Sequence, residues 1–406
     1  MAERRLVIGA LDRRGDGIAE GDGAMIRVPG TLPGETVIAD GDGERLRLLS
    51  LVAPSPERVV PFCKHYDRCG GCQLQHWRED PYRTWKQGLV EASLRSRGID
   101  ASVRTLIDAH GEGRRRVSIH VRRKDGIVTA GFMAARSHTL LDLDFCPILV
   151  PALSPAFDIA RAIGEKTGDG DVALTATEGG LDVGIRAERK VVELEMAKFA
   201  SLAASLDLAR LSLNGSVVAT IRPPLVLMGK AQVAVPPGSF LQATTRGETE
   251  LGRLVCEALG KAKTVADLFS GCGPFTFRMA ERAKVQAYDS DRPAIASLQA
   301  AARGTAGLKP ITAIVRDLFR EPLVANELKA FDTVVFDPPR AGAEAQSRQL
   351  AKSRVKTVIA VSCDVQSLAR DAAILVAGGY TLDALTAVDQ FKWTSHVEIV
   401  AVFRKT

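Results

Sequence analysis

The chain has 406 residues, a net charge of +6 and a pI of about 9.0. Its hydrophobic fraction of 46% excludes an intrinsically disordered chain and suffices for the cores of two or three domains. The first residues lack the apolar core of a signal peptide, and no apolar run reaches the roughly 18 residues of a membrane span. We therefore expect a cytoplasmic protein without membrane contact, and the modest basic excess permits a polyanionic partner.

Residues 1–56 alternate short apolar runs with turns rich in glycine and proline. This pattern predicts a small five-stranded β-barrel, an architecture that often binds single-stranded nucleic acid. Because the segment contains few aromatic residues for base stacking, we expect contacts to phosphates instead. RNA binding is the favoured role, and a purely structural module is the alternative.

Four cysteines mark the next segment, which we assign to a central domain over residues 57–240. Cys63, Cys69 and Cys72 are separated by five and then two residues, and Cys146 follows far downstream. Clustered cysteines in a cytoplasmic chain indicate metal ligation or catalysis rather than disulfides. The spacing favours a 4Fe-4S cluster. A zinc site with four thiolates is the alternative, although its knuckles are usually paired CxxC motifs.

Two more features of the central domain concern packing and charge. The spacing of apolar residues over Glu79–Arg97 predicts an amphipathic helix that packs against the domain. The basic runs 114–116 and 122–124 flank a short apolar strand, Val117 to Val121. This arrangement predicts a ridge that contacts RNA phosphates, and a solvated surface is the alternative.

Residues 241–406 alternate regularly between apolar strands and helical segments, which predicts a doubly wound α/β domain. The strands are expected to end at Phe269, Asp289, Val315, Asp337 and Cys363. Two further strands, Leu382 to Phe391 and Val397 to Phe403, follow one another too closely for a crossover helix. They are therefore predicted to form an antiparallel hairpin at one edge of the sheet.

The run from Asp267 to Phe275 reads as a strand end, a tight glycine turn and a helix start, where backbone can approach a ligand closely. Asp289 follows Asp267 by 22 residues at the end of the next strand, the usual offset for a carboxylate that binds ribose. Asp317 is placed to reach an adenine, with a surface role as the alternative. Because the full GxGxxG pattern is missing, S-adenosylmethionine is favoured over a dinucleotide.

Cys363 ends an apolar strand and precedes a helix that we predict from about Gln366 to Val376. The partial positive charge of a helix N-terminus favours the thiolate, which is the nucleophilic form of cysteine. A buried, inert thiol is the usual alternative for an isolated cysteine. The neighbouring motif from Asp337 to Arg340 and the glycine turn favour a methyltransferase with a cysteine nucleophile.

These features together resemble the RNA 5-methyluridine methyltransferase family, specifically its iron-sulfur branch that modifies 23S ribosomal RNA. The resemblance spans nearly the whole chain. Besides the four cysteines, it rests on Val28 to Gly30, Pro33 to Glu35, Phe240 to Gln242, Asp337 to Arg340, Ser362 to Asp364 and Thr394 to Glu398. It implies a TRAM-like barrel over 1–56, a mixed α+β iron-sulfur domain over 57–240 and a class I methyltransferase domain over 241–406.

The resemblance also assigns roles to residues. Cys363 would be the nucleophile and Glu398 the base. Residues that would hold S-adenosylmethionine are Gln242, Phe269, Asp289, Asp317 and Asp337. The chain departs from the family pattern where Pro274 replaces an Asn, Val365 replaces a Pro, and Thr244 or Thr245 replaces an Asn.

The favoured function is methyl transfer from S-adenosylmethionine to C5 of a uridine in 23S ribosomal RNA, through a covalent adduct between the cysteine and C6. A tRNA substrate is the alternative within the same class, disfavoured because the tRNA branch generally lacks the four cysteines. Amino methyltransferases normally carry an aromatic residue where this chain has Arg340. From another class, the chain would be a cluster-bearing, RNA-binding or redox-sensing protein with an inactive methylase domain. We expect a monomer that binds RNA.

Overall fold

The computed structural model describes residues 3–21, 24–188 and 195–405. The described chain divides into two compact units, and each collects segments that are far apart in sequence. The first unit comprises Met1–Val90, Met133–Thr139 and Phe391–His396, and the second comprises Glu91–Phe132, Leu140–Gln390 and Val397–Thr406. The predicted boundaries at residues 56 and 240 do not coincide with the limits of these units.

The first unit begins with two antiparallel sheets of three strands, in the orders β1-β5-β6 and β2-β3-β4. Their strands are β1 (Arg4–Val7), β2 (Ala10–Leu11), β3 (Gly17–Gly21), β4 (Ala24–Val28), β5 (Thr36–Asp40) and β6 (Arg47–Ala53). Side chains from both sheets, among them Leu6, Ile26 and Val37, share one buried cluster. The predicted short strands are therefore present, but the predicted five-stranded barrel is wrong: the described residues form six strands in two separate sheets over one core.

Helix α1 (Glu79–Arg95) confirms the predicted amphipathic helix, with Tyr82 buried on its apolar face. Lys86 is also fully buried on α1, and its Nζ donates to the carbonyl oxygens of Phe391 at 3.3 Å and His396 at 2.6 Å. The Tyr82 hydroxyl accepts from the backbone N–H of Trp393 at 2.9 Å. These contacts within the first unit hold both ends and the middle of segment 391–396.

The second unit contains a seven-stranded mixed sheet in the order β10-β9-β8-β11-β12-β13-β14. Its strands are β8 (Arg116–Lys124), β9 (Ile127–Met133), β10 (Leu140–Asp142), β11 (Gly170–Thr177), β12 (Gly180–Ala187), β13 (Arg210–Leu213) and β14 (Ser216–Thr220). Helices α2 (Ala156–Thr167) and α3 (Met196–Ser205) pack against these strands, and β15 (Leu225–Met228) pairs with β16 (Ala231–Ala234). Among the described helices, none combines the length and apolar character needed to cross a membrane.

The predicted basic ridge at 114–116 is wrong for Arg115, whereas Arg116 is partly exposed. Arg115 is buried, and its guanidinium donates to Glu248 Oε2 at 2.6 Å and to the carbonyl oxygen of Gln242 at 3.0 Å. Arg116 donates to the carbonyl oxygen of Leu241 at 2.9 Å and stacks on the Phe240 ring. The carboxylate and carbonyl acceptors give the buried Arg115 guanidinium the partners it requires. Arg115 and the partly exposed Arg116 both contact the segment that begins the α/β domain.

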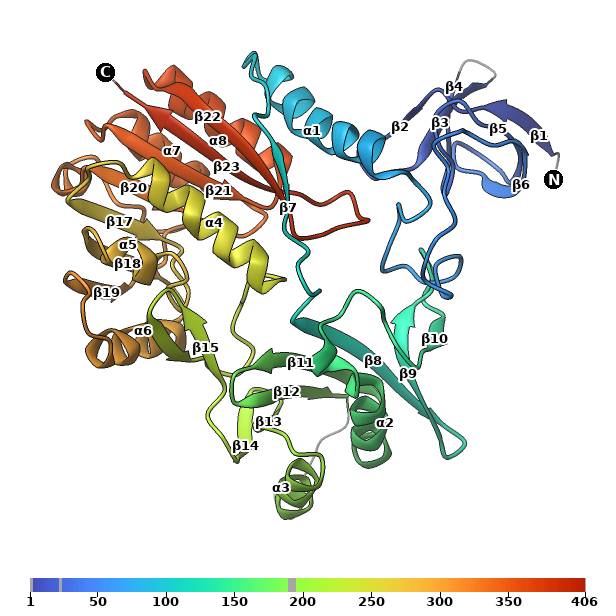
Figure 1. Ribbon diagram of the computed structural model, residues 1–406, viewed down its shortest axis with the longest axis horizontal. Coiled ribbons are helices and arrows are strands. Elements are labelled where there is room, and N and C mark those ends of the chain that lie inside the picture. The colour runs from blue at the N-terminus through green and yellow to red at the C-terminus, as the bar shows by residue number, and fades with distance from the viewer. Residues whose placement is uncertain (1–2, 22–23, 189–194, 406) are drawn as a thin grey trace. The chain divides into compact units, whose positions relative to one another are not determined.

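The α/β domain is built on an eight-stranded sheet in the order β19-β18-β17-β20-β21-β23-β22-β7 (Figure 1). The strands are β7 (Leu106–Asp108), β17 (Thr264–Leu268), β18 (Lys284–Asp289), β19 (Ile311–Val315), β20 (Thr333–Phe336), β21 (Thr357–Ser362), β22 (Thr381–Asp389) and β23 (Glu398–Arg404). The strands β17 to β21 pair in parallel, which confirms the doubly wound prediction. Strand order reverses between β17 and β20, where open α/β sheets bind ligands.

The terminal hairpin is antiparallel as predicted, but it does not form the edge of the sheet. Strand β23 inserts between β21 and β22, antiparallel to both. Beyond β22, the short strand β7 pairs in parallel with residues 387–389 and becomes the edge strand. A strand of three residues has too short an apolar pattern to be recognised in a sequence.

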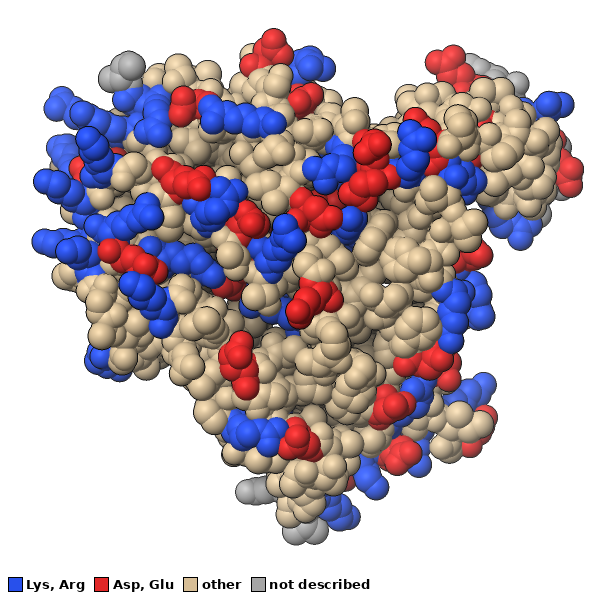
Figure 2. All heavy atoms as spheres, in the orientation of Figure 1, with Lys and Arg blue, Asp and Glu red and all other residues tan. Residues whose placement is uncertain are grey.

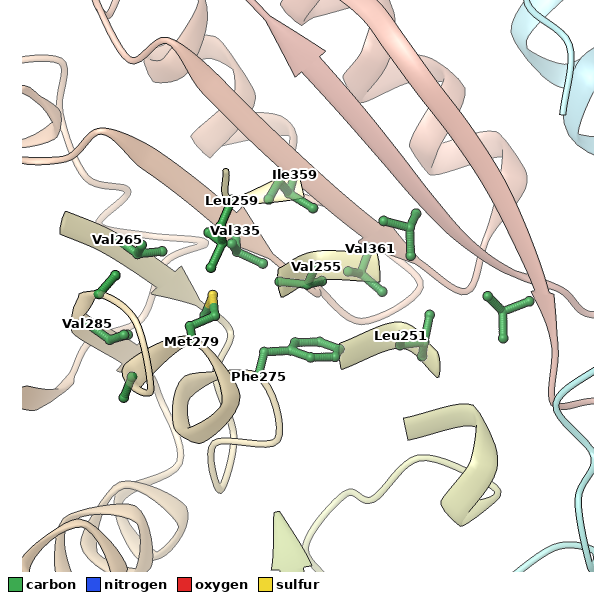
Figure 3. Packing of buried hydrophobic residues seen from close by; sticks show 14 of the residues in the cluster. Leu251, Val255, Leu259, Val265, Phe275, Met279, Val285, Val335, Ile359 and Val361 are labelled. Carbon is green, nitrogen blue, oxygen red and sulfur yellow. The ribbon is translucent and has the colours of Figure 1, made fainter. Parts of the chain in front are cut away.

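Helices cover both faces of this sheet. They are α4 (Thr245–Ala258), α5 (Thr276–Ala280), α6 (Arg292–Gly304), α7 (Glu344–Ala351) and α8 (Val365–Ala377). Figure 3 shows the core under α4 and α5, where Leu251, Val255 and Phe275 point toward Val335 and Val361 of the central strands. The central strands are almost continuously apolar because both of their faces are covered. This core holds the carboxyl ends of β17, β20 and β21 in fixed register.

Candidate active site

A tight loop follows β17 at the point where strand order reverses. Phe269 has a φ of +60°, Gly271 of +52° and Gly273 of +94°, so three residues use left-handed backbone conformations. A Cβ on Gly273 would lie 3.0 Å from side-chain atoms of Leu298 and Phe277, which explains the glycine there. The Gly271 N–H donates to Asp289 Oδ2 at 2.8 Å. The predicted glycine turn and the carboxylate of the next strand are therefore in direct contact.

The other predicted cofactor residues near this loop already accept hydrogen bonds from the backbone, to different extents. Both oxygens of Asp289 accept backbone N–H groups, from Gly271 and from Asp291 at 2.8 Å. Asp317 follows β19, and its Oδ1 accepts the N–H groups of two residues further along the chain, 319 and 320. The rings of Phe269 and Phe319 lie 5.3 Å apart. Phe319 is an aromatic neighbour of the site that sequence reasoning missed.

Asp267 is a fully buried carboxyl group at the base of the loop. Its Oδ2 accepts from Thr276 Oγ1 at 2.5 Å, whereas Oδ1 has no partner within the described residues. Burial raises the pKa of Asp267 to about 7, and the negative charges of Asp337 and Asp289 act in the same direction. The loop is thus surrounded by carboxyl groups whose charge would be relieved by a cationic ligand.

A continuous chain of side-chain hydrogen bonds joins four residues of the α/β domain. Gln242 Nε2 donates to Asp337 Oδ2 at 3.1 Å. Gln390 Nε2 donates to Gln242 Oε1 at 2.6 Å and to Glu398 Oε1 at 3.0 Å. Gln242, Gln390 and Glu398 are each at most 2% exposed. The chain therefore brings together three predicted site residues, and its central member, Gln390, was not predicted.

Cys363 follows the last residue of β21. The register between β21 and β23 pairs Ser362 with Ile399, so the next position along each strand sets Cys363 opposite Glu398. The negative charges of Glu398 and Asp337 both act on the Cys363 thiol. The predicted nucleophile, the predicted base and one predicted cofactor residue therefore lie together at the carboxyl end of the sheet.

The expected stabilisation of a Cys363 thiolate by helix α8 is wrong, because other effects at this position are stronger. Burial raises the pKa of Cys363 to about 12, with further increases from the charges of Glu398 and Asp337 and a smaller opposing effect of Arg340. The Asp364 carboxylate caps α8 and accepts the N–H groups of residues 366 and 367. The cap uses the helix N-terminus that the thiolate was expected to exploit.

Glu398 is a buried carboxyl group and Asp337 a partly buried one, and the pKa of both is raised. Burial raises the pKa of Glu398 to about 7, partly offset by the hydrogen bond from Gln390. Burial and the charge of Glu398 raise the pKa of Asp337 well above its usual range. Glu398 Oε2 is buried and has no hydrogen-bond partner in the part of the chain that the structure describes. A carboxyl group with a pKa near neutrality is suited to accept and release a proton.

The raised pKa of Glu398 predicts a pH-dependent stability difference between the wild type and Glu398→Gln. Between pH 4.5 and 7 the folded wild type binds more protons at Glu398 than the unfolded chain, so its stability falls as pH rises. The pKa shift of Glu398 corresponds to roughly 3 kcal/mol of folding stability, which is lost as the pH rises to above 7. Glu398→Gln cannot ionise and escapes this loss. Urea denaturation should show the variant gaining stability relative to the wild type from pH 5 to pH 8, and a constant difference would contradict the buried carboxylate.

Thr244 and Gln390 form the supporting structure that sequence reasoning did not assign. Thr244, one of the departures from the family pattern, caps α4, and its Oγ1 donates to the carbonyl oxygen of Ala109 at 2.6 Å. Its backbone N–H donates to Gln390 Oε1 at 3.3 Å. One feature of the sequence could have revealed Gln390. Asp389 and Gln390 are two polar residues at the end of an apolar strand, and a buried polar side chain needs hydrogen-bond partners.

The four predicted cluster cysteines are distributed over the two units. Cys63, Cys69 and Cys72 belong to the first unit and Cys146 to the second, and all four are partly exposed. Burial raises the pKa of Cys69, and the charge of Cys63 adds to the effect. Within the described residues, no three or more His, Cys, Asp or Glu side chains are grouped so that they could hold a metal ion. The structure therefore does not confirm the predicted cluster.

The fold places the chain in a known structural class. The structure matches the Pyrococcus abyssi tRNA (uracil-54, C5)-methyltransferase, solved with S-adenosyl-L-homocysteine, with a TM-score of 0.76 and 24% identity over 98% of this chain and 100% of that one. This likeness defines a class I methyltransferase fold.

Sequence comparison identifies the family. Residues 231–406 match the family described as tRNA (Uracil-5-)-methyltransferase. An uncharacterized RNA methyltransferase of Brucella suis is 43% identical over 99% of this chain and 98% of its own length. The 23S rRNA (uracil(1939)-C(5))-methyltransferase RlmD of Halomonas elongata is 34% identical over 97% of this chain and 88% of its own length. The chain belongs to the RNA (uracil-C5)-methyltransferase family and is an enzyme that depends on S-adenosylmethionine.

Proposed function

We propose that this enzyme methylates C5 of a uridine in 23S ribosomal RNA through a covalent bond between Cys363 and C6 of the base. The observation that supports the mechanism is the antiparallel register of β21 and β23, whose last pair is Ser362 and Ile399, so that Cys363 and Glu398 come next to each other across the two strands. The Halomonas elongata relative, named for 23S rRNA, supports the substrate. The description of the matched family names tRNA, so a tRNA substrate is the second candidate.

Uracil C5 is too weak a carbon nucleophile to accept a methyl group unaided. Addition of the Cys363 thiolate to C6 pushes the electron pair of the C5–C6 bond into an enolate, and this charge makes C5 reactive. After methylation, C5 still carries its original proton. Removal of that proton by Glu398 reforms the C5–C6 double bond and expels the thiolate. The proton therefore passes from C5 to Glu398, and Cys363 returns unchanged.

The cofactor provides the methyl group and, through its sulfonium, a positive charge. Gln242, Phe269, Asp289, Asp317 and Asp337 are the proposed binding residues. The surroundings fit a cation: several carboxyl groups are buried, and the buried Ser270 Oγ has no partner within the described residues. A positive charge beside Glu398 and Asp337 would offset the effect that raises the pKa of Cys363. Thiolate formation would then depend on an occupied cofactor site.

The target uridine must leave its base stack, because Cys363 has to reach C6 while C5 faces the methyl donor. An unpaired nucleotide in a loop is the least costly substrate of this kind. Figure 2 shows Lys and Arg side chains interspersed with fewer acidic ones over the part of the second unit that holds α4, α5 and α7. Such a surface suits a phosphate backbone. We also propose that the enzyme acts in the cytoplasm as a monomer.

Mapping 5-methyluridine in RNA from a strain that lacks this protein tests the substrate. We expect one uridine of 23S ribosomal RNA to lose its methyl group, and the wild-type gene to restore it. Complementation with Cys363→Ala is the matched control and should not restore it. Loss of 5-methyluridine from tRNA with unchanged 23S ribosomal RNA would favour the second candidate.

We further propose that Cys63, Cys69, Cys72 and Cys146 hold a 4Fe-4S cluster, which would place the chain in the iron-sulfur branch of its family. Four thiolates are the ligand set that such a cluster requires, and the spacing of the first three supports it. Protein purified without oxygen should be brown and contain iron and acid-labile sulfide. Cys69→Ala should lose both and unfold more readily, because binding energy of the cluster contributes to folding. Stoichiometric zinc without iron would refute the proposal.

A further inference from the structure

We propose that Gln390 is a positioning residue that sets the geometry of Glu398 for proton removal and connects it to Gln242 and Asp337. This inference rests on the proposed function, in which Glu398 removes the C5 proton and Gln242 and Asp337 bind the cofactor. It assigns a role to a residue that lies outside the catalytic and cofactor-binding residues predicted from the sequence.

The orientation of the Gln390 amide follows from its three hydrogen bonds. Both Nε2 protons are used, one by Gln242 Oε1 at 2.6 Å and one by Glu398 Oε1 at 3.0 Å. Its Oε1 accepts the Thr244 backbone N–H at 3.3 Å. The flipped amide would face two acceptor oxygens with its own oxygen and leave the Thr244 N–H without an acceptor. One orientation is therefore strongly favoured.

The side chain of Gln390 is tightly packed against helix α4. Gln390 is 0% exposed. A Cβ added to Gly247 of α4 would lie 2.6 Å from Gln390 Oε1 and 2.9 Å from Gln390 Cβ, closer than real contacts allow. Glycine at 247 thus makes the space that the amide occupies. The tight packing restricts Gln390 to the rotamer that reaches both Gln242 and Glu398.

This geometry distinguishes the two oxygens of Glu398. Oε1 is held by Gln390, whereas Oε2 is buried without a partner among the described residues. A carboxylate held at one oxygen keeps the other directed at one place, and Oε2 is the oxygen left to collect the C5 proton. The hydrogen bond from Gln390 therefore determines which oxygen of Glu398 acts as the base and fixes the position of that oxygen.

The same amide connects the base to the cofactor residues. Hydrogen bonds run from Gln390 to Gln242 and from Gln242 Nε2 to Asp337 Oδ2 at 3.1 Å. The charged and titratable groups that act around this chain are Glu398, Asp337, Cys363, Asp267, Asp289 and Arg340. Because Asp337 and Glu398 are largely desolvated, a change of charge at Asp337 alters the field at Glu398 strongly. Cofactor binding and proton removal would thus be coupled through two amide groups.

Two variants test this role with in vitro transcribed 23S ribosomal RNA as the substrate. Gln390→Leu removes all three hydrogen bonds at similar volume, and Gln390→Glu keeps the shape but cannot donate to both partners. In both, we expect turnover to fall by roughly tenfold to hundredfold, less than the loss expected for removing the base itself. A methylated covalent protein-RNA adduct should accumulate, and the acid limb of the pH profile for turnover should move to higher pH.

Gln346→Leu provides the matched control. Gln346 is also 0% exposed, and among the described residues its side chain hydrogen-bonds to the backbone N–H and carbonyl oxygen of Leu323. This variant should lose stability without accumulating an adduct or shifting the pH profile. The comparison separates a positioning role from a general effect of removing a buried amide.

RNA containing 5-fluorouridine separates failure of this inference from failure of the proposed function. Fluorine at C5 cannot be removed as a proton, so the wild type should be trapped as a covalent adduct. Absence of that adduct in the wild type would refute the covalent mechanism itself. If the wild type is trapped but both Gln390 variants turn over normal RNA at the wild-type rate, or lose activity without a methylated adduct, the positioning role is wrong.

Discussion

Cys363→Ala is expected to abolish methyl transfer and all covalent capture of RNA. Without the thiol no group can add to C6, so C5 never gains the charge that makes it reactive. Methyl transfer from radiolabelled S-adenosylmethionine should fall below detection. RNA that contains 5-fluorouridine should run free of protein on a denaturing gel, whereas the wild type should shift it.

Cys256→Ala is a suitable control for this experiment. Cys256 lies on α4, is partly buried like Cys363, and packs against the core rather than at the carboxyl end of the sheet. This variant should retain both methyl transfer and RNA capture. Capture of RNA by Cys363→Ala would show that another group is the nucleophile.

Glu398→Gln is expected to fail at a later step than Cys363→Ala. The glutamine keeps an oxygen that can accept from Gln390, but it cannot take the C5 proton. Attack by Cys363 and methyl transfer should proceed, while elimination stops. A methylated adduct that resists denaturant should therefore accumulate, with turnover reduced by 10²- to 10⁴-fold, the range of a lost general base.

The mass of the trapped species makes the result specific. Digestion of the adduct should yield the peptide that contains Cys363 joined to a uridine carrying one added methyl group. Gln346→Leu, which leaves the site intact, should give no such peptide. An adduct without the methyl group would assign Glu398 to an earlier step, and normal turnover would exclude it as the base.

The sequence alone determined the parts of this protein that depend on local pattern. Apolar runs, glycine turns and helical spacing place the strand ends within about a residue of Leu268, Asp289, Val315, Phe336 and Ser362. These signals lie within short windows, where periodicity and turn chemistry act directly. The same locality explains why Cys363, Asp337 and the glycine turn could be selected as a common site, since parallel strands end at one side of a sheet.

The surface position of Arg115 and the thiolate at Cys363 were mispredicted for a related reason. Charge runs and helix ends are visible in a sequence, but their partners are not. Arg115 finds Glu248, which lies 133 residues away, and becomes a buried ion pair. Cys363 meets Glu398 and Asp337, whose charges raise its pKa instead of lowering it. Burial and neighbouring charge outweigh the helix N-terminus at this position.

Tertiary structure alone decided how the proposed base meets the proposed nucleophile. Insertion of β23 between β21 and β22 sets Glu398 opposite Cys363, whereas β22 beside β21 would displace it by one strand spacing of about 4.8 Å. Gln390 joins Gln242 across 148 residues of sequence. The order in which strands pair, and the networks of buried side chains, depend on how segments far apart in the sequence pack together. No local sequence pattern encodes that packing. The sequence therefore determined which groups are available for the proposed chemistry, and the fold decided which oxygen of Glu398 is held by Gln390.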